Sequence, residues 1–132
     1  MMENNQRAFT SVGKKKILVV DDDPTTLKML EGILGAAGYD VVRASAGQDA
    51  IDLAREQKPD LLVLDIELPG MDGINVAFKL RELPETKNIP IVFLSALMGK
   101  EIERETSATP RSSFLRKPVI KDVLLGELKK YF

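Results

Sequence analysis

Cysteine and histidine are both absent from this chain of 132 residues. Without cysteine, the protein cannot form disulfides, use a thiolate as a nucleophile or bind a metal through sulfur. Without histidine, it has neither an imidazole base nor an imidazole metal ligand. Any chemistry that the protein performs must therefore use carboxylate, hydroxyl and lysine groups.

Long apolar runs and a strong excess of one charge are missing as well. The longest apolar runs are a few residues, and the N-terminal segment MMENNQRAFTSVGKKK lacks the apolar core of a signal peptide. We therefore expect a cytoplasmic location and no membrane contact. The 19 basic and 20 acidic residues give a net charge of -1, which provides no global attraction for nucleic acid, so we expect no direct nucleic-acid contact.

What is present is the composition of one ordinary globular domain. Hydrophobic residues make up 44% of the 132 residues, and a chain of this size buries roughly two thirds of the surface that its unfolded form exposes. We expect residues 14 to 132 to form this domain. Residues 1 to 13 are expected to be a flexible polar arm, because the first residues of a domain are poorly ordered unless they are tied down.

Short apolar runs alternate with segments of helical period along the chain. The runs predict five strands, at 16–20, 39–44, 60–65, 89–95 and 112–116, and the continuous apolar character of DLLVLD is typical of a central parallel strand. Asp23 and Pro24 resemble a helix cap and first turn, and we expect Leu27, Leu30, Leu34 and Ala37 on the inner face of that helix. Further helices are expected at 47–57, 74–83 and 120–131, with a weak one between the last two strands.

This alternation of strands and helices predicts an α/β fold with a parallel sheet between two helical layers. In such a sheet the carboxyl ends of the strands share one edge, where ligands bind. Asp21 and Asp22, then Asp65, Ser95 and Lys117 each follow or end one of the apolar runs. The sequence therefore predicts one site that combines carboxylates, a hydroxyl and a lysine, groups suited to a divalent cation and a phosphoryl group.

Four motifs at these strand ends carry a resemblance to a known family. VVDDDP, LLVLDIELPGMDG, IVFLSA and LRKPV together resemble the successive signatures of the receiver domain of bacterial response regulators, over about residues 16 to 132. The resemblance implies a three-layer α/β/α sandwich of the flavodoxin-like, doubly wound (βα)5 type, with strand order 2-1-3-4-5. It implies a signalling module of a two-component phosphorelay rather than an ordinary enzyme.

The same resemblance implies a role for each polar residue at the predicted edge. Asp65 would accept a phosphoryl group from a sensor histidine kinase or a histidine phosphotransfer protein, with Mg²⁺ as cofactor. Ser95 and Lys117 would be catalytic, and Pro118 suggests a cis peptide bond that aims Lys117. The metal ligands would be the carboxylates of Asp21, Asp22 and Asp65 and the backbone carbonyl of Glu67.

The resemblance also implies a switch and a partner for its output. Ser95 and Phe114 would change position together on phosphorylation, and because Phe114 lacks the hydroxyl of the commoner tyrosine, we expect it to favour the inward position. The altered state would be read by a downstream protein or by an output domain outside this sequence.

Two departures from the family pattern are visible. Glu67 adds a carboxylate beside the expected phosphoryl site, where it could repel the donor, hold a water or contact Lys117, so we expect an altered lifetime of the acyl phosphate. The segment ALMGKEIERETSATPR has a thin apolar face, which predicts a fourth helix that is short, mobile or dependent on a partner.

Two alternatives remain open at this point. Asp21, Asp23 and Thr25 also match the DxDxT motif of haloacid dehalogenase-type phosphohydrolases, although that family does not explain Asp65, and Asp23 is more simply a helix cap. The second alternative is a degenerate receiver that acts only as a binding module.

Overall fold

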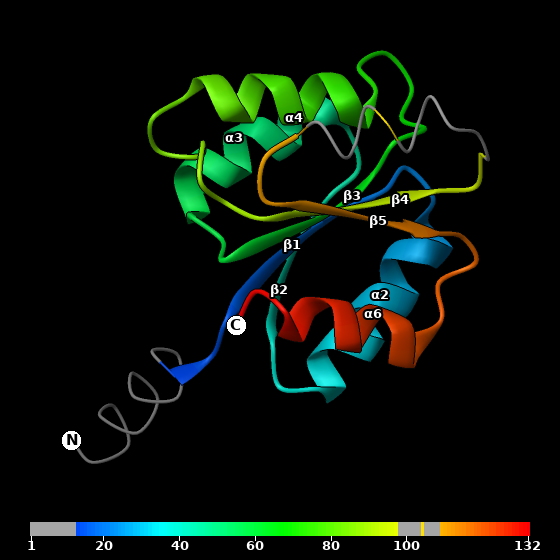
Figure 1. The fold of residues 1–132 in the computed structure, drawn as a ribbon. Helices are drawn as coiled ribbons and strands as arrows, with labels where there is room; N and C mark the ends of the chain where they lie inside the picture. Colours follow the sequence, from blue (N-terminus) through cyan, green and yellow to red (C-terminus); the bar gives the residue numbers. More distant parts are fainter. Residues whose placement is uncertain (1–12, 98–103, 105–108) are drawn as a thin grey trace.

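Five parallel strands form one sheet in the computed structural model, which describes residues 13–97, 104 and 109–132. The strand order is β2-β1-β3-β4-β5 (Figure 1), so the predicted order is confirmed. The strands, which begin and end within two residues of the predicted bounds, are β1 Lys16–Val20, β2 Asp40–Ala44, β3 Leu61–Asp65, β4 Ile91–Ser95 and β5 Ser112–Arg116.

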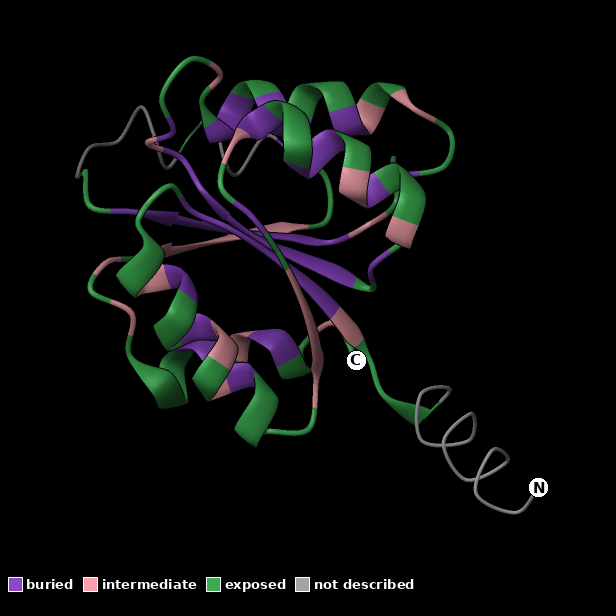
Figure 2. Cartoon of the chain, turned by 180° about the vertical axis from the view of Figure 1, so that it is seen from behind, coloured by how far each residue is buried: buried purple, intermediate pink, exposed green. Residues whose placement is uncertain are grey.

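Both faces of the central strands are buried, as their continuous apolar sequences predict. Ile17 and Val19 of β1 pack into one hydrophobic cluster, whereas Leu18 and Val20 pack into the other. Because successive side chains of a strand point to opposite faces, each central strand contributes to two cores. Figure 2 shows the buried strands running between two half-exposed helical layers.

Four helices within the described residues cover these two faces (Figure 1). Helices α2 (Pro24–Ala36) and α6 (Lys121–Lys129) contribute leucines to the cluster of Ile17. Helices α3 (Gly47–Gln57) and α4 (Gly73–Glu82) contribute aliphatic side chains to the cluster of Leu18. The predicted three-layer α/β/α sandwich is therefore confirmed.

One predicted core position is wrong. Ala37 is exposed and forms the C-cap of α2, whereas Leu27, Leu30 and Leu34 are buried as expected. The helix ends at Ala36, and Gly38 adopts a positive φ of 97° directly beyond the cap, so the chain turns away before Ala37 can reach the sheet.

Two other expectations from the sequence fall largely on segments outside the described residues. The arm at 1–13 lies outside the described residues except for Gly13, and most of the weak helix between β4 and β5 also lies outside them. In the part of the chain that is described, no helix combines the length and the apolar character needed to cross a membrane.

Gly73 permits the close packing of α4 against the end of β3. A Cβ atom at this position would lie 2.3 Å from the backbone oxygen of Asp65 and 2.9 Å from the Cα of Ile66. The N–H of Gly73 donates to the oxygen of Ile66 at 2.9 Å. The start of α4 therefore holds the backbone that carries Asp65.

We expect Gly73→Ala to lower the free energy of unfolding by more than about 2 kcal/mol, because the added methyl group must displace backbone atoms. Gly126→Ala is the matched control, since Gly126 is exposed in α6 with open space around its Cβ position. The control should gain about 0.5–1 kcal/mol from helix propensity. Urea unfolding of both variants measures the difference, and equal effects would exclude the proposed clash.

Candidate functional site

The polar residues predicted to meet do so at the carboxyl edge of the sheet. Asp21 directly follows β1, Asp65 ends β3, Ser95 ends β4 and Lys117 directly follows β5. The ladder brings these ends together, because the N–H of Lys117 donates to the oxygen of Ser95 at 2.8 Å and β3 pairs with β4. The site is thus built from strand ends that are far apart in sequence.

Three carboxylates form a cluster at this edge. One oxygen from each of Asp21, Asp22 and Asp65 lies within 4.8 Å of the others. Asp21 and Asp65 are 0% and 1% exposed, whereas Asp22 is exposed. Backbone N–H groups orient the buried pair, since Asp23 donates to Oδ1 of Asp21 at 2.9 Å and Glu67 donates to Oδ1 of Asp65 at 3.1 Å.

The ammonium group of Lys117 lies between the two buried carboxylates. Its Nζ atom is 2.9 Å from Oδ2 of Asp21 and 3.2 Å from Oδ2 of Asp65. The Lys117–Pro118 peptide bond is cis, which confirms that expectation. Lysine supplies the positive charge that two neighbouring buried carboxylates require.

The electrostatics of the cluster follow from this packing. Burial and the neighbouring charge of Asp21 raise the pKa of Asp65 to about 6, although Lys117 and the N–H of Glu67 act in the opposite direction. Partial burial alone would lower the pKa of Lys117, but its hydrogen bond to Asp21 and the charges of both aspartates raise it. Lys117 therefore remains a cation, and it does not fully offset the repulsion that Asp65 experiences.

The chemistry of this cluster fits a hard divalent cation. All of its donors are carboxylate oxygens, which Mg²⁺ prefers over nitrogen and sulfur ligands. Asp22 is exposed, so the cluster can be reached from solvent. Burial first, and then repulsion from Asp21, raises the pKa of Asp65, and a bound cation would favour its ionised form against both.

The side chain of Glu67 contacts Ser95. Contact with Lys117 was one of three possibilities that the sequence suggested, but Lys117 pairs with Asp21 and Asp65 instead. The hydroxyl of Ser95 donates to Oε2 of Glu67 at 2.5 Å, and the N–H of Ala96 donates to Oε1 at 2.9 Å. Sequence reasoning missed the N–H of Ala96, because a backbone donor carries no signal in residue type.

Phe114 and Asp23 also have defined positions. Phe114 lies beside Phe93 in the β4–β5 ladder and is partly buried against the cluster that contains Leu18. The carboxylate of Asp23 accepts from the N–H of Thr25 at 3.1 Å and from the hydroxyl of Thr26 at 2.9 Å. Asp23 is therefore the N-cap of α2, as expected, and its oxygens are already engaged.

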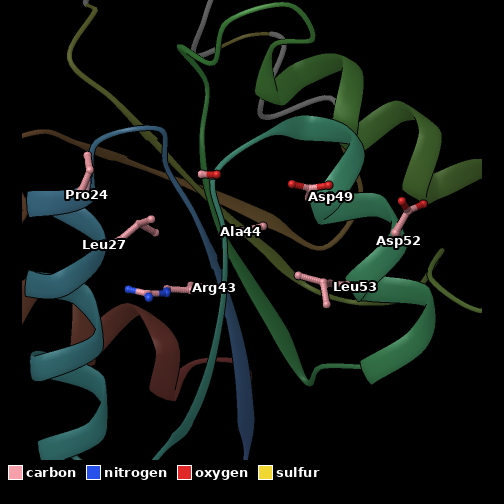
Figure 3. A pocket seen from close by; sticks show the side chains of 8 residues that line it. Pro24, Leu27, Arg43, Ala44, Asp49, Asp52 and Leu53 are labelled. Carbon is pink, nitrogen blue, oxygen red and sulfur yellow. The ribbon is translucent and has the colours of Figure 1, made fainter.

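A separate open pocket of about 600 Å³ lies between α2 and α3 (Figure 3). Pro24 and Leu27 line it from α2, Arg43 from β2, and Asp49 and Asp52 from α3. None of the residues that line it belongs to the carboxylate cluster or is Ser95 or Lys117. The pocket and the predicted site are therefore distinct. The side chain of Arg43, which lines the pocket, also pairs with Glu31 at 3.1 Å.

Comparisons with known proteins agree with this geometry. A family model described as the response regulator receiver domain matches residues 17–129. The chain is 41% identical over 110 residues to the response regulator PleD of Caulobacter vibrioides, which covers 83% of this chain and 24% of PleD. It is 30% identical over 117 residues to the polar-differentiation response regulator DivK of Brucella ovis, covering 89% of this chain and 95% of DivK. The chain thus spans about a quarter of the first relative and nearly all of the second.

Solved structures give the same result. The chemotaxis protein CheY4 of Vibrio cholerae superposes with a TM-score of 0.85 at 28% identity, over 91% of this chain and 100% of that chain. The receiver domain of the sensor histidine kinase PA1611 from Pseudomonas aeruginosa PAO1, solved with a magnesium ion in its active-site cleft, superposes with a TM-score of 0.82 at 25% identity. That match covers 90% of this chain and 98% of the other.

The raised pKa of Asp65 generates a prediction about stability. Because its folded pKa of about 6 exceeds the ordinary value of 3.8, ionisation of Asp65 destabilises the folded state as the pH rises from about 4 through 6. When a chelator keeps the protein free of metal at pH 7, Asp65→Asn should therefore raise the free energy of unfolding by roughly 1–3 kcal/mol. The gain should vanish near pH 4, where the wild-type carboxyl is largely protonated in the folded state.

Urea unfolding at both pH values measures this change. Asp52→Asn is the matched control, since Asp52 is exposed in α3, and it should alter stability by less than about 0.5 kcal/mol. A loss of stability in Asp65→Asn at pH 7 would instead mean that the attraction of Asp65 to Lys117 outweighs its burial.

Proposed function

Because this chain belongs to the response regulator receiver domain family, we propose that it is a phosphoacceptor module of a two-component phosphorelay. Asp65 takes a phosphoryl group from a phosphohistidine on a sensor histidine kinase or a histidine phosphotransfer protein. The observation that supports this most directly is the position of the Lys117 ammonium, 3.2 Å from Asp65 and 2.9 Å from Asp21. The carboxylate of Asp65, as the nucleophile, thus lies next to a cation that the fold holds in place.

In the proposed reaction, an oxygen of the Asp65 carboxylate attacks the phosphorus atom of the donor. The P–N bond to the imidazole breaks, the imidazole leaves, and an acyl phosphate forms on Asp65. Transfer of this kind depends mainly on positioning and on neutralising charge. The buried position of Asp65 and its hydrogen bond from the N–H of Glu67 fix the direction of the attacking carboxylate.

The other residues of the site provide the electrostatics. Lys117 pairs with one phosphoryl oxygen as a point charge, and the hydroxyl of Ser95 donates to another. The residues that would hold Mg²⁺ are Asp21, Asp22, Asp65 and the backbone carbonyl of Glu67. When bound, Mg²⁺ supplies positive charge that screens the carboxylates from one another and from the incoming phosphoryl group.

The proposed output is a change in packing on the far side of β4 and β5. Ser95 moves toward the phosphoryl group, and Phe114, which already packs partly against the core, turns further inward. A downstream protein, or an output domain beyond this sequence, reads the change. The proposed setting is the cytoplasm, without direct contact to nucleic acid or membrane.

The first test is phosphorylation by a small donor. With acetyl phosphate and Mg²⁺, we expect one phosphoryl group per chain, on Asp65, detected by mass spectrometry as an acid-stable and base-labile adduct. Asp72→Asn is a matched control, because Asp72 caps α4 and asparagine caps equally well; it should retain the adduct, whereas Asp65→Asn should lose it. Multiple turnovers without an adduct would indicate a phosphohydrolase, and neither result would indicate a degenerate receiver.

A second test separates the role of Lys117 from metal binding. Lys117→Ala should slow phosphorylation by about 10²-fold, a typical effect of removing one charged group from a reacting centre. The same variant should bind Mg²⁺ at least as tightly as the wild type, because Lys117 no longer occupies the oxygens of Asp21 and Asp65.

The increase in unfolding free energy on adding Mg²⁺ measures this binding. Lys130→Ala is the control, since Lys130 is exposed and pairs with Glu127. Weaker Mg²⁺ binding in Lys117→Ala than in Lys130→Ala would contradict the proposed division of roles.

A further inference from the structure

Glu67 uses both oxygens of its side chain on the end of β4. Oε2 accepts from the hydroxyl of Ser95 at 2.5 Å, and Oε1 accepts from the N–H of Ala96 at 2.9 Å. Such paired hydrogen bonds to an ionised carboxylate are stronger than neutral ones. We call this pair of contacts the Glu67 latch.

The latch occupies the hydroxyl of Ser95, which the proposed function assigns to a phosphoryl oxygen, and the neighbouring N–H of Ala96. Ser95 is 0% exposed, and its hydroxyl has a single proton, so it can donate to only one acceptor at a time. The backbone of Glu67 is tied to the phosphoacceptor, because its N–H donates to Oδ1 of Asp65 at 3.1 Å. The carboxylate of Glu67 is thus held beside Asp65 while it binds the donors of the neighbouring strand.

Lys117 does not pair with the negative charge of the Glu67 side chain. Its ammonium group pairs with Asp21 and Asp65, and no ion pair within the described part of the chain joins it to Glu67. The negative charge of Glu67 is therefore stabilised mainly by Ser95 and Ala96. An acyl phosphate on Asp65 would bring a second anion toward the same two donors.

We propose that Glu67 is an internal competitor of the phosphoryl group. The inference rests on the proposed function of Asp65. In the unphosphorylated protein, Glu67 holds the hydroxyl of Ser95 and the N–H of Ala96; on phosphorylation, these donors pass to a phosphoryl oxygen and the carboxylate of Glu67 is expelled. The latch therefore opposes phosphorylation, and its release moves a negative charge at the start of the loop after β4.

Binding of beryllium fluoride, a phosphoryl analogue, tests the competition at equilibrium. With Mg²⁺ present, Glu67→Ala should bind the analogue about tenfold more tightly than the wild type, because the loss of one charge-assisted acceptor frees both donors. Glu67→Gln should lie between the two, since it keeps an acceptor and loses the charge.

Asp23→Asn is the matched control for charge. Asp23 also carries a negative charge near this edge, but it contacts Thr25 and Thr26, and asparagine preserves the cap. We expect its affinity for the analogue to change by less than about twofold. A gain equal to that of Glu67→Ala would show that general charge, and not the latch, governs binding.

A double-mutant cycle tests whether Glu67 acts through Ser95. In a Ser95→Ala background, the tenfold gain should fall to about threefold, because only the contact with Ala96 remains to be released. A gain that is unchanged in this background would overturn the latch.

Hydrogen exchange provides a measurement that does not depend on any phosphoryl ligand. In the metal-free, unphosphorylated protein, the amide of Ala96 should exchange faster in Glu67→Ala than in the wild type, because it loses its acceptor. Equal exchange in the two proteins would overturn the latch.

The outcomes also separate this inference from the proposed function. If the wild type binds beryllium fluoride and Glu67→Ala binds it equally well, the latch is wrong and the phosphoacceptor role stands. If the folded wild type and all variants fail to bind it, the phosphoacceptor role fails and the competition fails with it.

Discussion

The structure depends on one electrostatic arrangement at the carboxyl edge of the sheet. Asp21 and Asp65 are both buried, and a buried charge without a partner costs several kcal/mol. The ammonium group of Lys117 lies 2.9 Å from the carboxylate of Asp21 and 3.2 Å from that of Asp65. A residue that follows the last strand thus partly offsets the charges of two residues at the ends of the first and third strands. The same triad places a cation beside a nucleophilic carboxylate. Lys117 lowers the cost of burying the two charges, although ionisation of Asp65 still destabilises the folded state. The contacts that suit the edge for chemistry are therefore not those that would maximise its stability.

The sheet provides the rigidity that this arrangement needs. Alternate residues of β1, β3 and β4 enter two separate cores, so the strand ends are held from both faces. Gly73 lets α4 begin against the backbone of Asp65, which fixes the third strand end further. Against this rigid frame, Ser95 and Glu67 form a contact that rotation of side chains can break. The proposed switch is thus a small polar rearrangement on a fixed scaffold.

Much of the fold was accessible from the sequence, for reasons that are local. Apolar runs predicted all five strands to within two residues, and Asp23 followed by Pro24 predicted the start of α2. Gly38 also predicted the end of α2, since it adopts a positive φ directly beyond the C-cap. The error at Ala37 arises because this residue is itself the C-cap, so it no longer belongs to the buried face of the helix. The predicted weak helix after β4 lies mostly outside the described residues.

The sequence by itself determined which groups reach the edge of the sheet, because a residue at the end of a buried parallel strand has no other place to go. It therefore identified Asp21, Asp65, Ser95 and Lys117 as neighbours before any contact was known. Only the tertiary structure decided which neighbour each group contacts. Lys117 pairs with the two buried aspartates, and Glu67 turns to Ser95 and to a backbone N–H. Those choices depend on differences of an ångström and on competing charges from separate strands, which the order of residues does not encode.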